Sequence, residues 1–311
     1  MYMLGFRVKV SGREHIKKAE ELGAIAVFNH SSYVDALIMM YMLAPSGVTK
    51  ASLSNLPVIK YIIKAYQVIF LREERPDTSV HNGSVSGSSS VQNGTSSDFT
   101  SDSKNGKLQL NGSGSLSSSS SGSHKARKPN PHAYIVTGSA TEVLKARVSD
   151  PTYGKPGGYP LIAIAPEGTC GDGRGLLEYR TGAFVPGVPV LPLCIKYGIG
   201  SHNPAWGQVY SVGWHFVRLM CQWRNEVEVT VLPPYVPSPE ERADPRLFAA
   251  NVRSLMGAAA GLPPQPHSYA HFLALKKLKV VVDWSGTAVL APPGVVEADG
   301  TIDFAKHGML M

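Results

Sequence analysis

The chain has 311 residues, of which 30 are Lys or Arg and 23 are Asp or Glu, so its formal net charge is +7. A positive balance favours nucleic acid or an anionic membrane surface as a partner, and three cysteines are too few for a disulfide-stabilised fold. Cys170, Cys194 and Cys221 also lack C-x-x-C spacing, and we expect no metal site. The basic residues are scattered without interleaved aromatic residues, so we expect no nucleic-acid partner.

Helix and strand patterns alternate along the first 76 residues. Residues 11–22 predict a helix that is capped by Ser11 and ends at Gly23. Four apolar segments then predict a buried strand, a helix closed by Pro45, a further helix and a second strand. In chain order these segments are residues 24–28, 35–43, 57–65 and 67–71.

Residues 77–131 have a different composition, in which Ser, Gly and Asn dominate and apolar residues occur singly. Such a segment cannot bury enough apolar surface to offset the entropy of ordering, so we expect a disordered insertion. The chain therefore divides into a first domain part, the insertion, a second domain part and a poorly defined tail. In order, these are residues 1–76, 77–131, 132–278 and 279–311.

The second domain part continues the alternation. It predicts an amphipathic helix at residues 139–147 and three strands at 161–165, 188–193 and 226–232. A final helix at 247–260 is predicted to stop at Gly261. Strands separated by helices indicate an α/β fold. We expect one domain in which helices pack on a mostly parallel central sheet, interrupted by the long disordered insertion.

His30 and Asp35 follow the first predicted strand directly, within residues 29–35 (NHSSYVD). Loops at the carboxyl ends of strands are where α/β proteins place functional residues. A carboxylate can fix the tautomer of a catalytic histidine and stabilise the imidazolium that forms. The two can meet only if His30 lies on the loop and Asp35 in the first helical turn. The alternative is that Asp35 merely caps the helix and His30 is an ordinary loop residue.

Charged residues also end two later strands. The guanidinium of Arg72 can bind a phosphate, although an ion pair with a neighbouring glutamate is the simpler interpretation of that residue alone. The strand at residues 161–165 is followed by Glu167, Gly168 and Thr169. Glycine there lets the backbone approach a ligand closely, and a plain turn explains it equally well.

The order and spacing of these motifs resemble the glycerolipid acyltransferase family of the bacterial sn-2 acyltransferase type, which is defined by four such blocks. The blocks here are residues 30–35, 68–72, 167–169 and 188–192. Two longer stretches, 166–184 (PEGTCGDGRGLLEYRTGAF) and 226–263, resemble the lysophosphatidylcholine and lysophosphatidylethanolamine acyltransferase branch. Apart from the insertion, the resemblance covers residues 24–262.

The resemblance implies an enzyme of phospholipid synthesis and remodelling that transfers an acyl group from acyl-CoA to the free hydroxyl of a lysophospholipid. His30 would be the general base, Asp35 would orient it, and the acyl group would pass directly to the acceptor. Acyl-CoA would be a co-substrate, and no cofactor is expected. Four residues would bind the glycerophosphate part of the acceptor: Arg72, Glu167, Gly168 and Thr169. Glu167 would act indirectly, by holding Arg72 or a substrate hydroxyl, because an anion beside a phosphate is unfavourable.

The same resemblance implies a membrane-associated protein of the endoplasmic reticulum, with its active site facing the cytosol. The sequence has no apolar run of about 18 residues, so we expect that an N-terminal membrane helix usual in this branch is missing. The branch's calcium-binding loop is also missing after Val280. Residues 209–223 (VYSVGWHFVRLMCQW) suit either a segment lying in the membrane interface or a core helix.

Two alternatives to this function stay open. The first is a 1-acylglycerol-3-phosphate acyltransferase, which would use lysophosphatidic acid as the acceptor. The second is a non-catalytic module whose basic residues dock on anionic lipid head groups. The His30 and Asp35 pair disfavours the second, because binding alone does not require a base and a residue that orients it.

Overall fold

A computed structural model describes residues 2–3, 5–50, 67, 69–71, 135–136, 140–198, 202–206, 211–282 and 288–308. The chain divides into two units, Met1–Glu73 with Pro129–Met311, and Glu74–Lys128. All described residues belong to the first unit. The expected disordered insertion at 77–131 and the expected helix at 57–65 lie outside the described residues, so both stay predictions.

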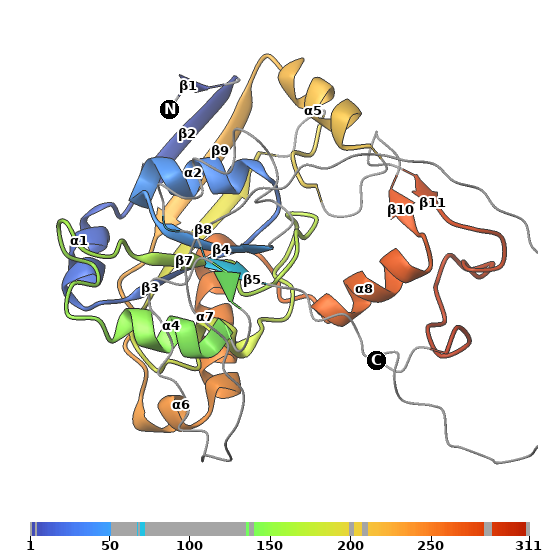
Figure 1. The fold of residues 1–311 in the computed structure, drawn as a ribbon. Helices are drawn as coiled ribbons and strands as arrows, with labels where there is room; N and C mark the ends of the chain where they lie inside the picture. The colour runs from blue at the N-terminus through green and yellow to red at the C-terminus, as the bar shows by residue number, and fades with distance from the viewer. Residues whose placement is uncertain are drawn as a thin grey trace, which may run out of the picture. The chain divides into compact units, whose positions relative to one another are not determined.

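The central element is a mixed but mostly parallel sheet of nine described strands (Figure 1). Their order across the sheet is β1 (Tyr2–Met3), β2 (Phe6–Ser11), β9 (Asn225–Val231), β8 (Val190–Tyr197), β3 (Ile25–Phe28), β7 (Ile162–Ile164), β4 (Ser46–Lys50), β5 (Ile69–Leu71) and β6 (Ile135–Val136). Only the β1–β2 and β8–β9 pairs are antiparallel in this sheet. The fold class expected from the sequence is therefore confirmed.

Helices pack on both faces of this sheet, and β3 shows why. Its side chains alternate between two hydrophobic clusters. Ala26 and Phe28 belong to the cluster that contains Ile38 of α2 (Val34–Leu43). Ile25 and Val27 belong to the cluster that contains Phe248 of α7 (Pro245–Ala260). A strand covered on both faces needs a continuous apolar sequence, which is what residues 24–28 have.

The remaining helices in the described part of the chain are shorter than α2 and α7. They are α1 (Glu14–Glu21), α4 (Ala140–Val148), the 3₁₀ helix η2 (Thr181–Ala183), α5 (Val212–Met220), α6 (Pro239–Ala243) and α8 (Tyr269–Lys277). A separate antiparallel pair, β10 (Val281–Val282) and β11 (Val289–Leu290), follows α8. No helix in the described part of the chain combines the length and the apolar character needed to cross a membrane.

The expected helix cap at Ser11 is wrong. Ser11 is the last residue of β2, and α1 begins only at Glu14. The reason is nonlocal, because residues 6–11 pair in parallel with β9, a strand more than 200 positions later. The expected end of this helix is confirmed, since Gly23 follows α1 with a φ of 61°.

Candidate active site

The loop that leaves β3 begins at Asn29, whose side chain continues the pairing of β3 with β8. Its amide nitrogen donates to the carbonyl of Ile195 at 2.8 Å, and its amide oxygen accepts from the Ile195 N–H at 2.7 Å. Asn29 is buried, so these two backbone groups of Ile195 depend on it. The side chain thus takes the place of a backbone strand residue, and the chain can turn away from the sheet at His30.

His30 and Asp35 meet in the way that the sequence requires. Nδ1 of His30 lies 2.8 Å from Oδ2 of Asp35, which is fully buried in the first turn of α2. The same Oδ2 accepts from the N–H groups of Ser31 and Ser32 at 2.7 and 2.9 Å. The loop is therefore wrapped around the carboxylate, which orients both the imidazole and the loop backbone.

Tyr197 is a further partner of Asp35 that the sequence analysis missed. Its hydroxyl donates a hydrogen bond to Oδ1 of Asp35 from the end of β8. Burial and the nearby Asp35 carboxylate raise the pKa of Tyr197 well above its usual range, so the hydroxyl keeps its proton and stays a donor. Both oxygens of Asp35 are therefore occupied.

The electrostatic setting makes His30 a strong base. Burial by itself lowers the pKa of His30, but the hydrogen bond with Asp35 and the nearby Cys170 raise it to about 10. With Nδ1 directed at Asp35, the neutral ring carries its proton on Nδ1 and its lone pair on Nε2. The side chain is 25% exposed, so the ring is accessible to a substrate.

Glu167 contacts the backbone of His30. It follows β7, the strand beside β3, and is 1% exposed. Oε1 accepts from the His30 N–H at 3.2 Å, and Oε2 accepts from the Leu177 N–H at 3.3 Å. Burial raises the pKa of Glu167 to about 8 despite these two donors. The sequence analysis did not foresee this contact, by which Glu167 holds the loop that carries the candidate base. The expected contact of Glu167 with Arg72 or a substrate hydroxyl stays a prediction.

The residues after Glu167 hold the other side of the same loop. The Gly171 N–H donates to the His30 carbonyl at 2.8 Å, so segment 167–171 holds both backbone groups of His30. Gly168 has a φ of 71°, and a Cβ there would lie 3.0 Å from Cδ of Arg180. The positive φ favours glycine at this position, and the Arg180 side chain would have to shift to admit a Cβ. Thr169 is buried, whereas Gly168 is exposed.

Of the six expected site residues, the structure describes five. Arg72 lies outside the described residues, so its expected contact with phosphate stays a prediction. Arg180, which the sequence analysis did not single out, is an exposed cation beside Gly168, with its guanidinium 4.9 Å from the ring centre of Tyr269. Among the described residues, no group of three or more His, Cys, Asp and Glu side chains could hold a metal ion.

An imidazole held by a buried carboxylate at the carboxyl edge of an α/β sheet defines a candidate general-base site. Comparison with known proteins indicates which class of enzyme this site resembles. Residues 7–107 match the family model described as Acyltransferase. This match to an acyltransferase family model, over about a third of the chain, confirms the resemblance found in its sequence.

Several curated proteins are similar to this chain in sequence. The chain is 31% identical over 255 residues to Lysophospholipid acyltransferase LPEAT1 of Arabidopsis thaliana, covering 82% of this chain and 49% of that protein. It is 42% identical over 129 residues to Lysophosphatidylcholine acyltransferase 1 of Danio rerio, covering 41% and 24%. It is 25% identical over 307 residues to Lysophosphatidylcholine acyltransferase of Drosophila melanogaster, covering 97% and 44%. The chain spans about half the length of these relatives or less.

Among solved structures, the chain is similar to the 1-acyl-sn-glycerophosphate (LPA) acyltransferase PlsC from Thermotoga maritima. The sequence identity is 17% and the TM-score 0.41, with 83% of this chain and 72% of that chain covered.

Proposed function

We propose that this protein transfers an acyl group from acyl-CoA to the free hydroxyl of lysophosphatidylcholine or lysophosphatidylethanolamine. The observation that carries the proposal is the 2.8 Å contact between His30 Nδ1 and Asp35 Oδ2 on the loop after β3. The acyltransferase-family domain and the names of the relatives support the same reaction class.

In this mechanism the neutral His30 accepts the proton of the lysophospholipid hydroxyl on Nε2. The hydroxyl oxygen attacks the thioester carbonyl, a C–O bond forms and the C–S bond breaks. The CoA thiolate leaves and takes the proton from the imidazolium, so His30 returns to its neutral form. Asp35 stabilises the imidazolium between these steps. No acyl-enzyme forms, so Ser31, Ser32 and Cys170 are not required as nucleophiles.

The acceptor's glycerophosphate part would lie near Arg72, Gly168 and Thr169. Arg72 suits a phosphate by its charge, and Glu167 supports the site through the backbone N–H of His30. The positive net charge of the chain suits the phosphates of CoA and an anionic membrane surface. The proposed location is the endoplasmic reticulum membrane, with the site facing the cytosol.

The proposal is tested by offering the purified protein acyl-CoA with three acceptors in competition: lysophosphatidylcholine, lysophosphatidylethanolamine and lysophosphatidic acid. Mass spectrometry of the products then identifies the acceptor. We expect phosphatidylcholine or phosphatidylethanolamine as products. Phosphatidic acid as the dominant product would favour the 1-acylglycerol-3-phosphate alternative, and the absence of CoA release would favour a non-catalytic lipid-binding module.

The role of His30 is tested by His30→Ala, which should abolish acyl transfer while the circular dichroism spectrum is unchanged. His15→Ala is a matched control, because His15 lies at the start of α1, where its ring is 3.9 Å from the carboxylate of Glu14. We expect that this control retains the wild-type rate. Full activity in His30→Ala would disprove the mechanism.

A further inference from the structure

Helix α5 has four large hydrophobic side chains on the outside, although Leu219 faces the core. Trp214, Phe216, Val217 and Met220 are 64%, 44%, 46% and 40% exposed, whereas His215 is 2% exposed. A helix that packs on a water-soluble domain has the opposite arrangement, with polar residues outward and apolar residues inward. The exposed tryptophan and phenylalanine of α5 therefore require an explanation beyond the fold of this domain.

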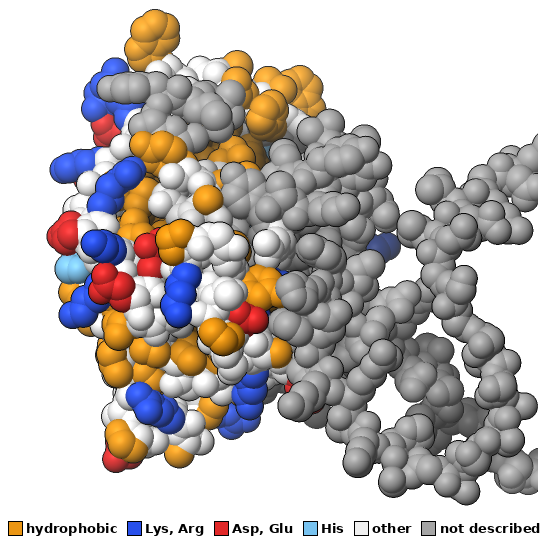
Figure 2. Space-filling model, turned by 60° about the vertical axis from the view of Figure 1, so that its left-hand side comes forward, with side chains coloured by type: hydrophobic (Ala, Val, Ile, Leu, Met, Phe, Trp, Pro, Cys, Tyr) orange, Lys and Arg blue, Asp and Glu red, His pale blue; other side chains and the backbone are white. Residues whose placement is uncertain are grey.

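The exposed hydrophobic residues form one continuous surface. At about 100° per residue, Gly213, Trp214, Phe216, Val217 and Met220 occupy a single arc of about 160° around the helix axis. This arc contains no charged residue. Figure 2 shows hydrophobic side chains gathered in the upper part of the view, where Figure 1 places α5. Trp223, just after the helix, is 96% exposed. We call the arc and Trp223 together the α5 surface.

The inner side of α5 lies against the loop that carries the candidate base. The hydroxyl of Tyr33, a residue between His30 and Asp35, lies 3.4 Å from Nδ1 of His215. The ring of Tyr33 also packs edge-on to Trp206, with centroids 5.2 Å apart. The Trp206 N–H donates to the carbonyl of Ser31 at 2.7 Å. Phe216 of the α5 surface also lies against Tyr33, with ring centroids 6.4 Å apart, so the α5 surface adjoins the loop of His30 directly.

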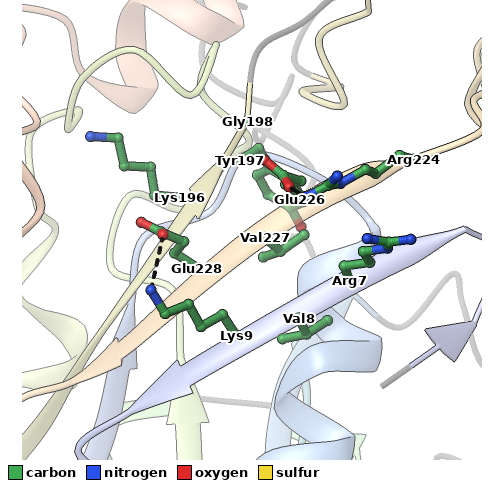
Figure 3. Close-up of a pocket in the computed structure, with 10 residues that line it drawn as sticks. All are labelled: Arg7, Val8, Lys9, Lys196, Tyr197, Gly198, Arg224, Glu226, Val227 and Glu228. Carbon is green, nitrogen blue, oxygen red and sulfur yellow. Dashed lines mark hydrogen bonds and ion pairs between the residues drawn. The ribbon is translucent and has the colours of Figure 1, made fainter.

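Basic side chains lie close to the α5 surface. Trp223 is followed directly by Arg224, which lines a hollow of about 460 Å³ over β2, β9 and the end of β8 (Figure 3). The charged residues of this hollow are Arg7, Lys9, Lys196, Arg224, Glu226 and Glu228. Lys9 is ion-paired with Glu228 and Arg224 with Glu226, and the cations outnumber the anions by two. Arg218 also borders the exposed arc on α5 itself. An apolar surface with cations beside it complements an anionic bilayer better than it complements a second apolar protein surface.

We propose that the α5 surface inserts into the lipid–water interface of a membrane, which brings the loop of His30 to the bilayer. Tryptophan favours this interface because its ring is apolar and its N–H is polar, and α5 has Trp214 near one end and Trp223 beyond the other. The docked bilayer would also supply the acceptor lipid, and this part of the proposal rests on the proposed function. The docking itself does not depend on catalysis.

The proposal is tested with the full chain and sucrose-loaded vesicles of phosphatidylcholine and phosphatidylserine, in the absence of acyl-CoA. The test variant is Val217→Glu/Met220→Glu, which places two charges in the centre of the α5 surface. The control is Leu247→Glu/Leu255→Glu on α7, whose side chains are similarly exposed, at 41% and 39%. We expect that the α5 variant loses about tenfold or more of the vesicle-bound fraction relative to free protein, while the control binds like the wild type.

Three results would overturn the docking. These are no vesicle binding by the wild type, equal binding by the α5 variant, or wild-type self-association that the α5 variant abolishes without any change in vesicle binding. The last would identify the α5 surface as an interface between copies of the chain. Acyl transfer is measured separately with the lysophospholipid in detergent micelles. Absence of acyl transfer in the wild type and in both variants would count against the proposed function and would leave the vesicle-binding result unchanged.

Discussion

The hydroxyl of Tyr197 donates a hydrogen bond to Oδ1 of Asp35, although the two residues are 162 positions apart in the chain. β8 is the neighbour of β3 in the sheet, and α2 follows β3, so the end of β8 reaches the first turn of α2. The arrangement extends the contact between His30 and Asp35 to a third side chain. Each oxygen of the carboxylate then has a defined partner, which fixes its orientation.

Tyr197→Phe tests whether this hydroxyl positions Asp35. Without it, Oδ1 of a fully buried carboxylate loses its side-chain donor, so we expect about a tenfold loss in kcat with little change in KM. Tyr179→Phe is the control, because its buried hydroxyl donates to the sulfur of Met256 instead. An unchanged kcat in Tyr197→Phe would exclude a positioning role.

Asp35→Asn tests the electrostatic coupling through the pH profile. The mechanism uses neutral His30, so kcat/KM should fall as the pH drops below the pKa of His30, which is raised to about 10. Replacing the carboxylate by an amide removes the negative charge that raises this pKa. The acidic limb should then move to lower pH, while the rate falls on the order of 10²- to 10⁴-fold because the imidazolium is no longer stabilised. A limb that stays in place would show that Asp35 does not act on His30.

Glu167→Gln tests the buried carboxyl group through stability. The pKa of Glu in an unfolded chain is about 4.3, whereas burial raises the pKa of Glu167 in the folded protein to about 8. Between these values the folded state binds more protons than the unfolded state, so the free energy of unfolding falls as the pH rises. Gln does not titrate, so the unfolding temperature of the variant should fall less between about pH 5 and pH 8 than that of the wild type. Glu178→Gln, at an exposed position, should leave the wild-type slope unchanged.

Cys170→Ala tests direct transfer against an acyl-enzyme. Cys170 lies next to the Gly171 N–H that bonds to His30, and it helps to raise the pKa of His30, so a thiol and an imidazole are neighbours. Direct attack by the acceptor hydroxyl does not require this thiol. We expect that Cys170→Ala retains at least about a third of the wild-type kcat, with no acylated protein detected by mass spectrometry of the intact wild type. A loss comparable to that in His30→Ala would instead support a covalent route.

Asn29→Ala tests the side chain that pairs β3 with β8. The variant leaves the N–H and carbonyl of Ile195 without their partner in the core, so we expect a destabilisation of about 2 kcal/mol or more in urea unfolding. Asn203→Ala is the control, because Asn203 also bonds to backbone groups through its amide but lies nearer to solvent. Equal effects of the two substitutions would contradict the role assigned to Asn29.

Local patterns were sufficient to predict much of the secondary structure near the site. The apolar run at 24–28 predicted β3, and the helix after it predicted that Asp35 lies within reach of His30, because only a turn separates a strand end from the first turn of the next helix. Gly23 and Gly261 were correctly predicted to end helices, since both adopt positive φ. These features depend on residues that are close in the chain.

The sequence by itself predicted the α/β class, and its resemblance to the acyltransferases implied the His30–Asp35 pair. Only the tertiary structure decided that β2 is a strand, that Tyr197 reaches Asp35, that Glu167 holds the backbone of His30, and that α5 faces outward. The physical reason is that the spacing of apolar residues, every second residue in a strand or every 3.6 residues in a helix, indicates that one face is buried. It does not indicate which element packs against that face. Strand order is set by hydrogen bonds between distant segments, and in this sheet that order brings the ends of β3, β7 and β8 together around one imidazole.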